Sequence, residues 1–240
     1  MKSSFERTPQ SYARVCGLIY LAIIGLGMFG ELYVRGTLVA SGDPATTAAN
    51  IAAHGLLWRA GVAGDLLMHV LDVPTIIIFY LLLRPVNHAL ALISTALNLV
   101  QSAVLALNKL TLLTPLLVAP YVNHPGGFSA EQWHSLSYLA IHLHTYGFAI
   151  GLIFFGFTCL IRGYLLYQSS YFPAPLGILV VLAGLSYVLN SYALIVSPAL
   201  AQALLPAILI PPFIGELSLA LWLLINGVNL PRWQQKVAAA

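Results

Sequence analysis

The sequence predicts an all-α protein, a polytopic membrane helix bundle of about six transmembrane helices with a short interfacial helix between the first two. Three observations lead to this prediction. Only 7% of the 240 residues are charged and 60% are hydrophobic, whereas soluble domains carry about 25% charged and about 45–50% apolar residues. The apolar residues form six runs, each close to the about 20 residues that a spanning helix needs. Turn and capping residues separate these runs.

Six segments are predicted to cross the membrane as one helical-bundle domain over residues 15–228. The first is retained rather than cleaved as a signal peptide, because its apolar run continues to Phe29 and is followed by Glu31 and Arg35 before any small-residue cleavage site. Tails at 1–14 and 229–240 are predicted to lie outside the membrane. The predicted spans are approximately 15–34, 60–83, 89–113, 136–161, 176–196 and 203–228.

Helical signals also occur outside the predicted hydrocarbon. Asp43 and Pro44 have the residue types of an N-cap and a first helical position, which predicts a short surface helix before the second span. Ser129 and Gln132 have the spacing of a capping box, so the fourth helix is expected to begin before it enters the membrane. The third apolar segment is too long for one straight span. Pro115 indicates a kink or an additional short helix there, which leaves six and seven spans open.

The lysines and arginines near the span ends predict the orientation of the bundle. With the N-terminus inside, seven of these cations lie on the inner side and three on the outer side. Because short cytoplasmic flanks carry the excess of Lys and Arg, both tails are expected in the cytoplasm. The inner residues are Lys2, Arg7, Arg14, Arg84, Arg162, Arg232 and Lys236, and the outer residues are Arg35, Arg59 and Lys109.

Polar residues inside the predicted spans are the candidate functional residues. A charge at the bilayer centre costs about 2.5–3.5 kcal/mol on insertion scales, so it normally faces a partner or water. Asp65, His69 and Asp72 fall on one narrow stripe of the second span at 100° per residue. Most polar positions map to the outer half, which predicts an outward-facing polar pocket closed on the cytoplasmic side. Its candidate residues are Asp65, His69, Asp72, Glu31, Arg35, Asn98, Gln101, His142, Tyr146, Asn190 and Glu216.

A structural network is the alternative interpretation of the same residues. Glu31 and Arg35 lie one helical turn apart and are able to pair. Asp65 would pair with Arg59 or Arg35, and the amide and tyrosine side chains would join neighbouring helices by hydrogen bonds. In this interpretation His69 and His142 are satisfied interior histidines rather than ligands.

An ordered set of segments runs from about Arg14 to Gly227: VRGTLVASGDPATTAANI, RAGVAGDLLMHVLDV, RPVNHALAL, HTYGFAIGLIFFG, GYLLYQSSYFPAPLGILVVLAGLSYVLNSY and IGELSLALWLL. With this set the chain resembles a bacterial family of multi-pass membrane proteins that carries the domain of unknown function 4386. The resemblance implies a bacterial cytoplasmic (inner) membrane and no particular activity. Close members often have an arginine and an aspartate where this chain has Asn98 and Asn190. That difference implies a structural link between the third and fifth spans and argues against a proton relay through them.

Binding or transport of a small molecule or ion through the outward-facing pocket is the favoured function. A non-catalytic membrane subunit or scaffold is the alternative, because small residues on several spans suit tight helix packing. The bilayer is the expected partner, and the absence of a basic patch argues against nucleic acid. The small residues considered are Gly25, Gly27, Gly151, Gly177 and Gly184.

An intramembrane metal-dependent hydrolase is a further, less favoured alternative. Asp65 and His69 have the i, i+4 spacing of two ligands on one helix, and His142 or His144 could supply a third. A haem between His69 and a histidine of the fourth span is compatible with the same positions. No HExxH signature is present, so no metal ligands are assigned, and the cofactor and the oligomeric state stay open.

Overall fold

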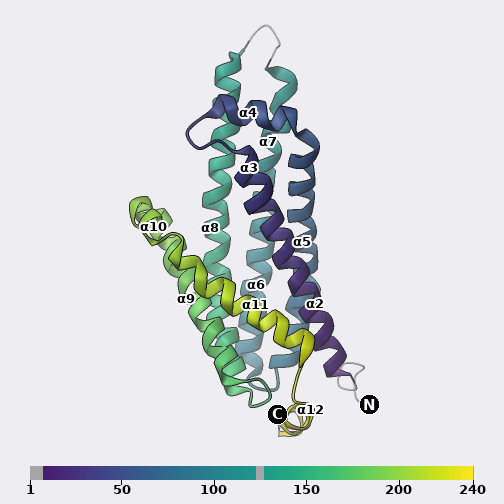
Figure 1. Ribbon diagram of the computed structural model, residues 1–240. Coiled ribbons are helices and arrows are strands. Elements are labelled where there is room, and N and C mark those ends of the chain that lie inside the picture. The colour runs from purple at the N-terminus through teal and green to yellow at the C-terminus, as the bar shows by residue number, and fades with distance from the viewer. Residues whose placement is uncertain (1–7, 123–126, 240) are drawn as a thin grey trace.

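A computed structural model describes residues 8–122 and 127–239 (Figure 1). These residues form helices and connections, without a strand among them. Within the described ranges, six helices are long and apolar enough to cross a membrane, which confirms the predicted polytopic all-α bundle. They are Pro9–Leu38, Gly55–Leu83, His88–Tyr121, Ala130–Gln168, Ala174–Val196 and Ala207–Ile225.

Several of these spans consist of more than one helical element. The elements of the first half are α2 (Pro9–Met28), the π-helical segment η1 (Phe29–Arg35), α3 (Gly36–Leu38), α4 (Pro44–Ala53), α5 (Gly55–Leu83), α6 (His88–Asn108), α7 (Leu110–Val118) and η2 (Ala119–Tyr121). Those of the second half are α8 (Ala130–Gln168), α9 (Ala174–Val196), α10 (Pro198–Leu204), η3 (Ala207–Leu209), α11 (Ile210–Ile225) and α12 (Leu230–Ala239).

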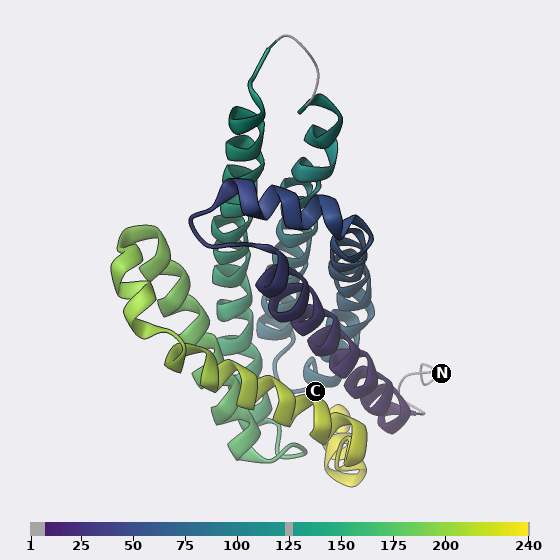
Figure 2. The ribbon, with the colours of Figure 1, turned by 45° about the horizontal axis from the view of Figure 1, so that its top comes forward.

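The long helix α8 runs along the bundle and contacts both α6 and α9 (Figure 1). Helix α5 packs between α2 and α6, and α11 packs against α9 and α2. Helix α4 lies across one end of the bundle, whereas α12 and the start of α2 lie at the opposite end (Figures 1 and 2). These are called the α4 end and the α12 end below.

Both helix starts that the sequence predicts outside the spans are confirmed. The Asp43 carboxylate accepts hydrogen bonds from the backbone N–H and the hydroxyl of Thr46, at 2.9 and 2.6 Å, at the start of α4. These bonds hold the pKa of the Asp43 carboxyl below its ordinary value. Ser129 and Gln132 form the reciprocal capping box, with bonds of 2.7 and 3.3 Å.

The long third apolar segment forms one span with a break rather than two spans. Helix α6 ends at Asn108, and Lys109 separates it from α7. Pro115 lies inside α7 and does not end it. The predicted additional short helix is therefore α7, which continues the same span toward the α4 end.

Three cations assigned to the flanks of the spans lie inside the bundle instead. Arg35, Lys109 and Arg162 are only 9%, 2% and 3% exposed. Helix α8 does not end near Ile161 as expected but continues to Gln168. Arg162 is therefore an interior residue, and the flank interpretation of these three residues is wrong.

Glycines permit a close contact between α8 and α9, the two spans that pack most extensively against each other. A Cβ at Gly163 would lie 2.6 Å from the carbonyl oxygen of Gly177 and 2.7 Å from the backbone nitrogen of Val181. A Cβ at Gly184 would lie 2.7 Å from the carbonyl oxygen of Gly156. Because backbone atoms stand on the far side in each case, a side chain can enter only if the helices separate.

Gly163→Ala is expected to lower the free energy of unfolding by about 1–3 kcal/mol, because the added methyl group forces α8 and α9 apart. Thermal unfolding of the purified protein in one detergent measures the effect. Gly25→Ala is the matched control, since Gly25 is exposed on α2 and a Cβ there meets nothing within 4 Å. Equal stability of the two variants would contradict the tight contact.

Candidate functional site

The predicted polar stripe of α5 faces the interior of the bundle. Asp65 and His69 are 1% and 5% exposed, and the side chain of Asp72 is 15% exposed. The three residues do not share one site. Asp65 belongs to a group of ionic side chains nearer the α4 end, and Asp72 lines a cavity nearer the middle of the bundle.

The ionic group, called the ion cluster, consists of Glu31, Arg35, Asp65, Lys109 and His144. Arg35 reaches Asp65 Oδ2 through Nη1 and Glu31 Oε2 through Nε, both at 2.7 Å. Lys109 Nζ lies 3.1 Å from the same oxygen of Asp65. The pairing of Arg35 with Glu31 and with Asp65 matches the structural alternative drawn from the sequence. Two carboxylates and two cations offset one another here.

Lys109 and His144 are the members outside the predicted polar pocket. From the sequence, Lys109 is expected on an outer flank, and His144 is considered only as a third metal ligand. Lys109 Nζ lies 3.1 Å from His144 Nε2 and 5.7 Å from the ring centre of Phe148. Asn108 donates a hydrogen bond of 2.8 Å to the backbone carbonyl of His144. The available signal was helical spacing, because Lys109 follows Asn98 by eleven residues and therefore faces the same side of the third span.

The local backbone of η1 brings the first span close to α5. A Cβ at Gly30 would overlap Asp65 Oδ1 and lie 3.1 Å from Arg35 Nη2. Glycine at this position therefore lets the buried carboxylate approach the backbone of η1. Wide π-helical turns of this kind are frequent at functional sites.

His69 stands between the ion cluster and the cavity. Its Nδ1 lies 3.3 Å from Asp72 Oδ2, and Ser102 donates to the same oxygen at 3.1 Å. Within the described part of the chain, His69 Nε2 and Asp65 Oδ1 are buried without a hydrogen-bond partner. The polar stripe thus continues from the ion cluster to the wall of the cavity.

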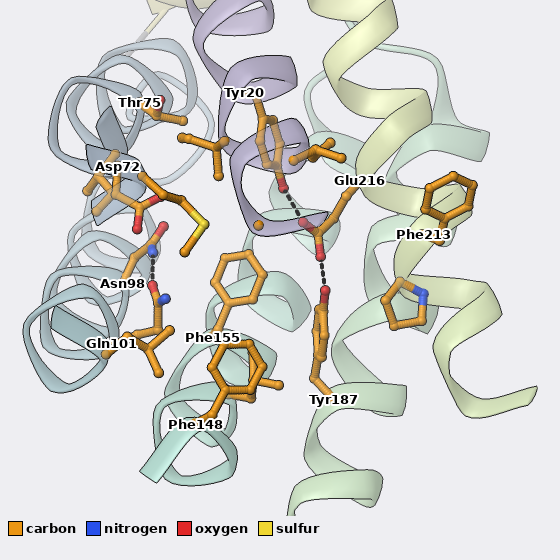
Figure 3. Close-up of a pocket in the computed structure, with 18 of the residues that line it drawn as sticks. Tyr20, Asp72, Thr75, Asn98, Gln101, Phe148, Phe155, Tyr187, Phe213 and Glu216 are labelled. Atoms are coloured by element: carbon orange, nitrogen blue, oxygen red, sulfur yellow. Dashed lines mark hydrogen bonds between the residues drawn. The ribbon is translucent and has the colours of Figure 1, made fainter. Parts of the chain in front are cut away.

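The cavity has a volume of about 280 Å³ and lies between α2, α5, α6, α8, α9 and α11 (Figure 3). Most of its walls are apolar, from Ile, Leu, Met and Phe side chains. Four predicted pocket residues line it: Asp72, Asn98, Gln101 and Glu216. The other predicted residues lie elsewhere. Glu31, Arg35 and Asp65 belong to the ion cluster, and His69 lies between that cluster and the cavity. His142 and Tyr146 are exposed on α8, and Asn190 is half-buried on α9.

Two tyrosine hydroxyls hold the carboxylate of Glu216 (Figure 3). Tyr20 of α2 donates to Oε2 at 3.2 Å, and Tyr187 of α9 donates to Oε1. The ring of Phe155 lies against Tyr187, with centres 5.4 Å apart. The carboxylate of α11 is therefore fixed from two sides at the cavity wall. Sequence reasoning did not include either tyrosine in the pocket.

Amide groups and a guanidinium occupy another part of the cavity wall. Asn98 donates to Gln101 Oε1 at 2.7 Å and accepts from Arg162 Nη2 at 2.5 Å. The guanidinium of Arg162 lies 4.1 Å from the ring centre of Phe79. Asn98 thus joins the third span to the fourth. The expected link to the fifth span through Asn190 is wrong, because Asn190 Oδ1 is buried without a partner among the described residues.

The mouth of the cavity lies between α2 and α11. The two helices touch near the α12 end, where a Cβ at Gly17 would lie 2.7 Å from the carbonyl oxygen of Ala220. They separate toward the α4 end (Figures 1 and 2). Met28, Leu209 and Phe213 line the cavity there and are 44%, 48% and 52% exposed. The opening therefore has an apolar rim on the side of the bundle.

A second cavity, of about 470 Å³, lies at the α4 end between α4, α7 and α8. Its lining includes one charged side chain, Arg59, and two polar aromatic side chains, His134 and Tyr138. None of the predicted pocket residues lines it. It is therefore separate from both the ion cluster and the cavity beside α11.

The geometry gives no support to the metal-dependent alternatives. Over residues 8–122 and 127–239, no three His, Cys, Asp or Glu side chains come close enough together to hold a metal ion. His142 is exposed, and His144 contacts Lys109 rather than His69. The three ligands that a catalytic zinc site needs are not assembled there.

Asp65→Asn is expected to destabilise the protein by about 3–5 kcal/mol, because it leaves Arg35 and Lys109 buried without their shared carboxylate. Glu31→Gln is the matched control. Its side chain is 59% exposed, and an exposed ion pair contributes about 0–1 kcal/mol. Chemical unfolding in detergent compares the two variants.

Adding Lys109→Met to Asp65→Asn is expected to restore part of the lost stability, because one uncompensated cation is removed. An Asp65→Asn variant as stable as Glu31→Gln would show that the ion cluster contributes little.

Comparison with known proteins assigns the chain to a family without a known activity. The family with the domain of unknown function DUF4386 matches residues 15–227. The chain is also similar to an uncharacterized protein of Archaeoglobus fulgidus, with 27% identity over 169 residues that cover 70% of this chain and 85% of that protein. No solved structure matches the chain. The family match spans nearly all six membrane-crossing helices, and the chain belongs to the DUF4386 family.

Proposed function

We propose that this protein binds a membrane-soluble small molecule in the cavity beside α11. The observation that carries the proposal is a cavity with apolar walls, a fixed carboxylate and a mouth on the side of a membrane bundle. Small-molecule sites are typically apolar concavities with a few well-placed polar groups. Glu216, Asp72 and the amides of Asn98 and Gln101 supply those groups.

The volume of the cavity indicates the size of the ligand. A cavity of about 150 Å³ holds benzene, so about 280 Å³ has room for about ten to twelve non-hydrogen atoms. A longer apolar chain would extend through the mouth into the lipid. An alkyl chain or a small ring system with one polar group fits this description.

Entry from the lipid follows from the rim of the mouth. Met28, Leu209 and Phe213 are each about half exposed and belong to spans that cross the membrane. In a bilayer such side chains face hydrocarbon. The proposal therefore replaces the outward-facing opening expected from the sequence with a lateral opening between α2 and α11.

The α12 end is proposed to face the cytoplasm of a bacterium. Once the interior cations are set aside, Arg14, Arg84, Arg232 and Lys236 lie near this end, and Arg59 lies near the α4 end. This distribution follows the excess of Lys and Arg in cytoplasmic flanks.

The scaffold alternative loses part of its support, because the small residues pack within the chain. Gly177 and Gly184 face α8, and Gly151 faces Leu105 of α6. Gly27 faces Met68 of α5 and lines the cavity. Gly25 alone of this set meets nothing within 4 Å. Four of these five glycines therefore pack within the chain and do not indicate a partner subunit.

Cysteine labelling in intact cells tests the orientation. Glu131→Cys, at the exposed start of α8, is expected to react with a membrane-impermeant maleimide, whereas Gln234→Cys on α12 reacts only after the cells are permeabilised. Wild type is the control, since Cys16 and Cys159 are buried. Labelling of position 234 but not 131 in intact cells would reverse the proposed orientation.

Photolabelling of the cavity wall tests the proposed function. The protein is placed in lipid nanodiscs with decanol that carries a diazirine on its chain, and labelled residues are mapped by mass spectrometry. Labelling of Phe155 and Tyr187, which line the cavity, is expected to saturate and to be competed by unlabelled decanol.

Gly27→Leu is expected to reduce this labelling at least fivefold, because the new side chain fills the mouth beside Met68. Gly25→Leu, two residues away on the exposed side of α2, is expected to leave it unchanged. Labelling that never saturates, or that both variants reduce equally, would contradict a binding cavity.

A further inference from the structure

The cavity contains a carboxylate, that of Glu216, without an ion-pair partner in the described part of the chain. Glu216 receives its hydrogen bonds from two neutral hydroxyls, those of Tyr20 and Tyr187. Among the described residues no Lys, Arg or His forms an ion pair with Glu216. This differs from the ion cluster, where Asp65 contacts two cations. A buried carboxylate without a cation is unfavourable unless another group supplies the positive charge.

We propose that the polar group of the ligand is cationic, so that the cavity selects an alkylammonium amphiphile whose head binds between Glu216 and Asp72. This inference rests on the proposed function and names its ligand class. The apolar body of the amphiphile would occupy the Met, Ile and Phe walls. Its ammonium head would take the place of the missing cation.

Glu216 has capacity for such a head. An ionised carboxylate offers about four lone-pair sites, and the two tyrosine hydroxyls occupy one on each oxygen. The tyrosines come from α2 and α9 and fix the carboxylate where it faces the cavity (Figure 3). An ammonium group can then bind the carboxylate without moving either tyrosine.

Asp72 supplies a second carboxylate on the α5 side of the same cavity (Figure 3). Its contacts with His69 and Ser102 both reach Oδ2. The other oxygen has no hydrogen bond to a described side chain and remains available. A primary ammonium head carries three N–H donors, so in the proposed pose it would donate to the carboxylates of α11 and α5.

The remaining charge of the cavity also favours a cation. Asp72 and Glu216 are two carboxylates against the single guanidinium of Arg162, which leaves one excess negative charge among the ionic lining residues. Arg162 is already engaged, because it donates to Asn98 and lies over the ring of Phe79. An anionic head would be repelled by the two carboxylates, whereas the guanidinium of Arg162 already has partners.

Aromatic rings give independent support for a cationic head. Phe148, Phe155 and Phe213 line the cavity together with Tyr20 and Tyr187. The faces of aromatic rings attract ammonium groups, and cages of such rings recognise quaternary ammonium ligands. The same residues provide apolar contact for the alkyl chain, so one set of side chains serves both parts of the ligand.

Competition among matched probes tests the ligand class. Decylammonium, decanol and decanoate share one chain length, and each competes with the diazirine decanol for labelling of Phe155 in nanodiscs of zwitterionic lipid at pH 7.5. Concentrations are expressed per lipid, which corrects for partitioning. The ammonium probe is expected to compete at a concentration at least tenfold lower than decanol, and decanoate is expected to be the weakest.

Two carboxamide variants connect this preference with the carboxylates. Glu216→Gln is expected to abolish the tenfold advantage of the ammonium probe while decanol still competes, and Asp72→Asn is expected to reduce it. Glu31→Gln, in the ion cluster, is expected to keep it. If Glu216→Gln does not fold, Asp72→Asn and Tyr187→Phe are compared with wild type in the same assay, and an undiminished advantage in both variants overturns the inference.

The outcomes separate the ligand class from the proposed function. Equal competition by decanol and the ammonium probe keeps the binding cavity and overturns the cationic head. Strongest competition by decanoate also overturns it and makes Arg162 the recognition group. Absence of saturable labelling with any probe overturns the binding function itself.

Discussion

The carboxylate of Asp65 is the contact on which the arrangement of the first three spans depends. One of its oxygens meets Arg35 of the first span and Lys109 of the third at 2.7 and 3.1 Å. Because a charge buried away from water is stable only with partners, the three spans must meet at this depth. Gly30 makes the approach feasible, since any side chain there would occupy the position of the carboxylate. The ion cluster therefore acts as a fixed point, and the rest of the bundle is positioned around it.

The cavity beside α11 is the place where this compensation is incomplete. Glu216 has hydroxyl partners and forms no ion pair with a described residue, and Arg162 is paired with an amide and a ring. The stripe of α5 joins the two regions, because Asp65 and Asp72 lie at its ends and His69 lies between them. The same helix thus carries a neutralised carboxylate in the ion cluster and an available one at the cavity. This contrast, rather than polarity alone, distinguishes a structural contact from a candidate binding site.

Local signals in the sequence predicted the spans, the surface helix and both caps, because hydrophobicity and capping depend on neighbouring residues. The partners of the polar residues were harder to predict, since they depend on which helices pack together and on their rotation. Lys109 has the charge of a flanking residue, and its burial follows only from its contact with α5. Tyr20 and Tyr187 look like packing residues until α2, α9 and α11 are seen to converge on one carboxylate. Asn190 was expected to meet Asn98, but Asn98 bonds to Arg162 instead.

The environment of Phe213 shows whether the mouth between α2 and α11 opens to lipid or to water. A spin label at Phe213→Cys, in protein reconstituted in nanodiscs, reports collisions with oxygen, which concentrates in lipid, and with a water-soluble nickel complex. Cys16 and Cys159 are buried and leave the added thiol as the reactive one in the described chain. A mouth that opens to lipid predicts frequent collisions with oxygen and few with nickel. Frequent collisions with nickel would show that the mouth opens to water, and they would contradict entry from the bilayer.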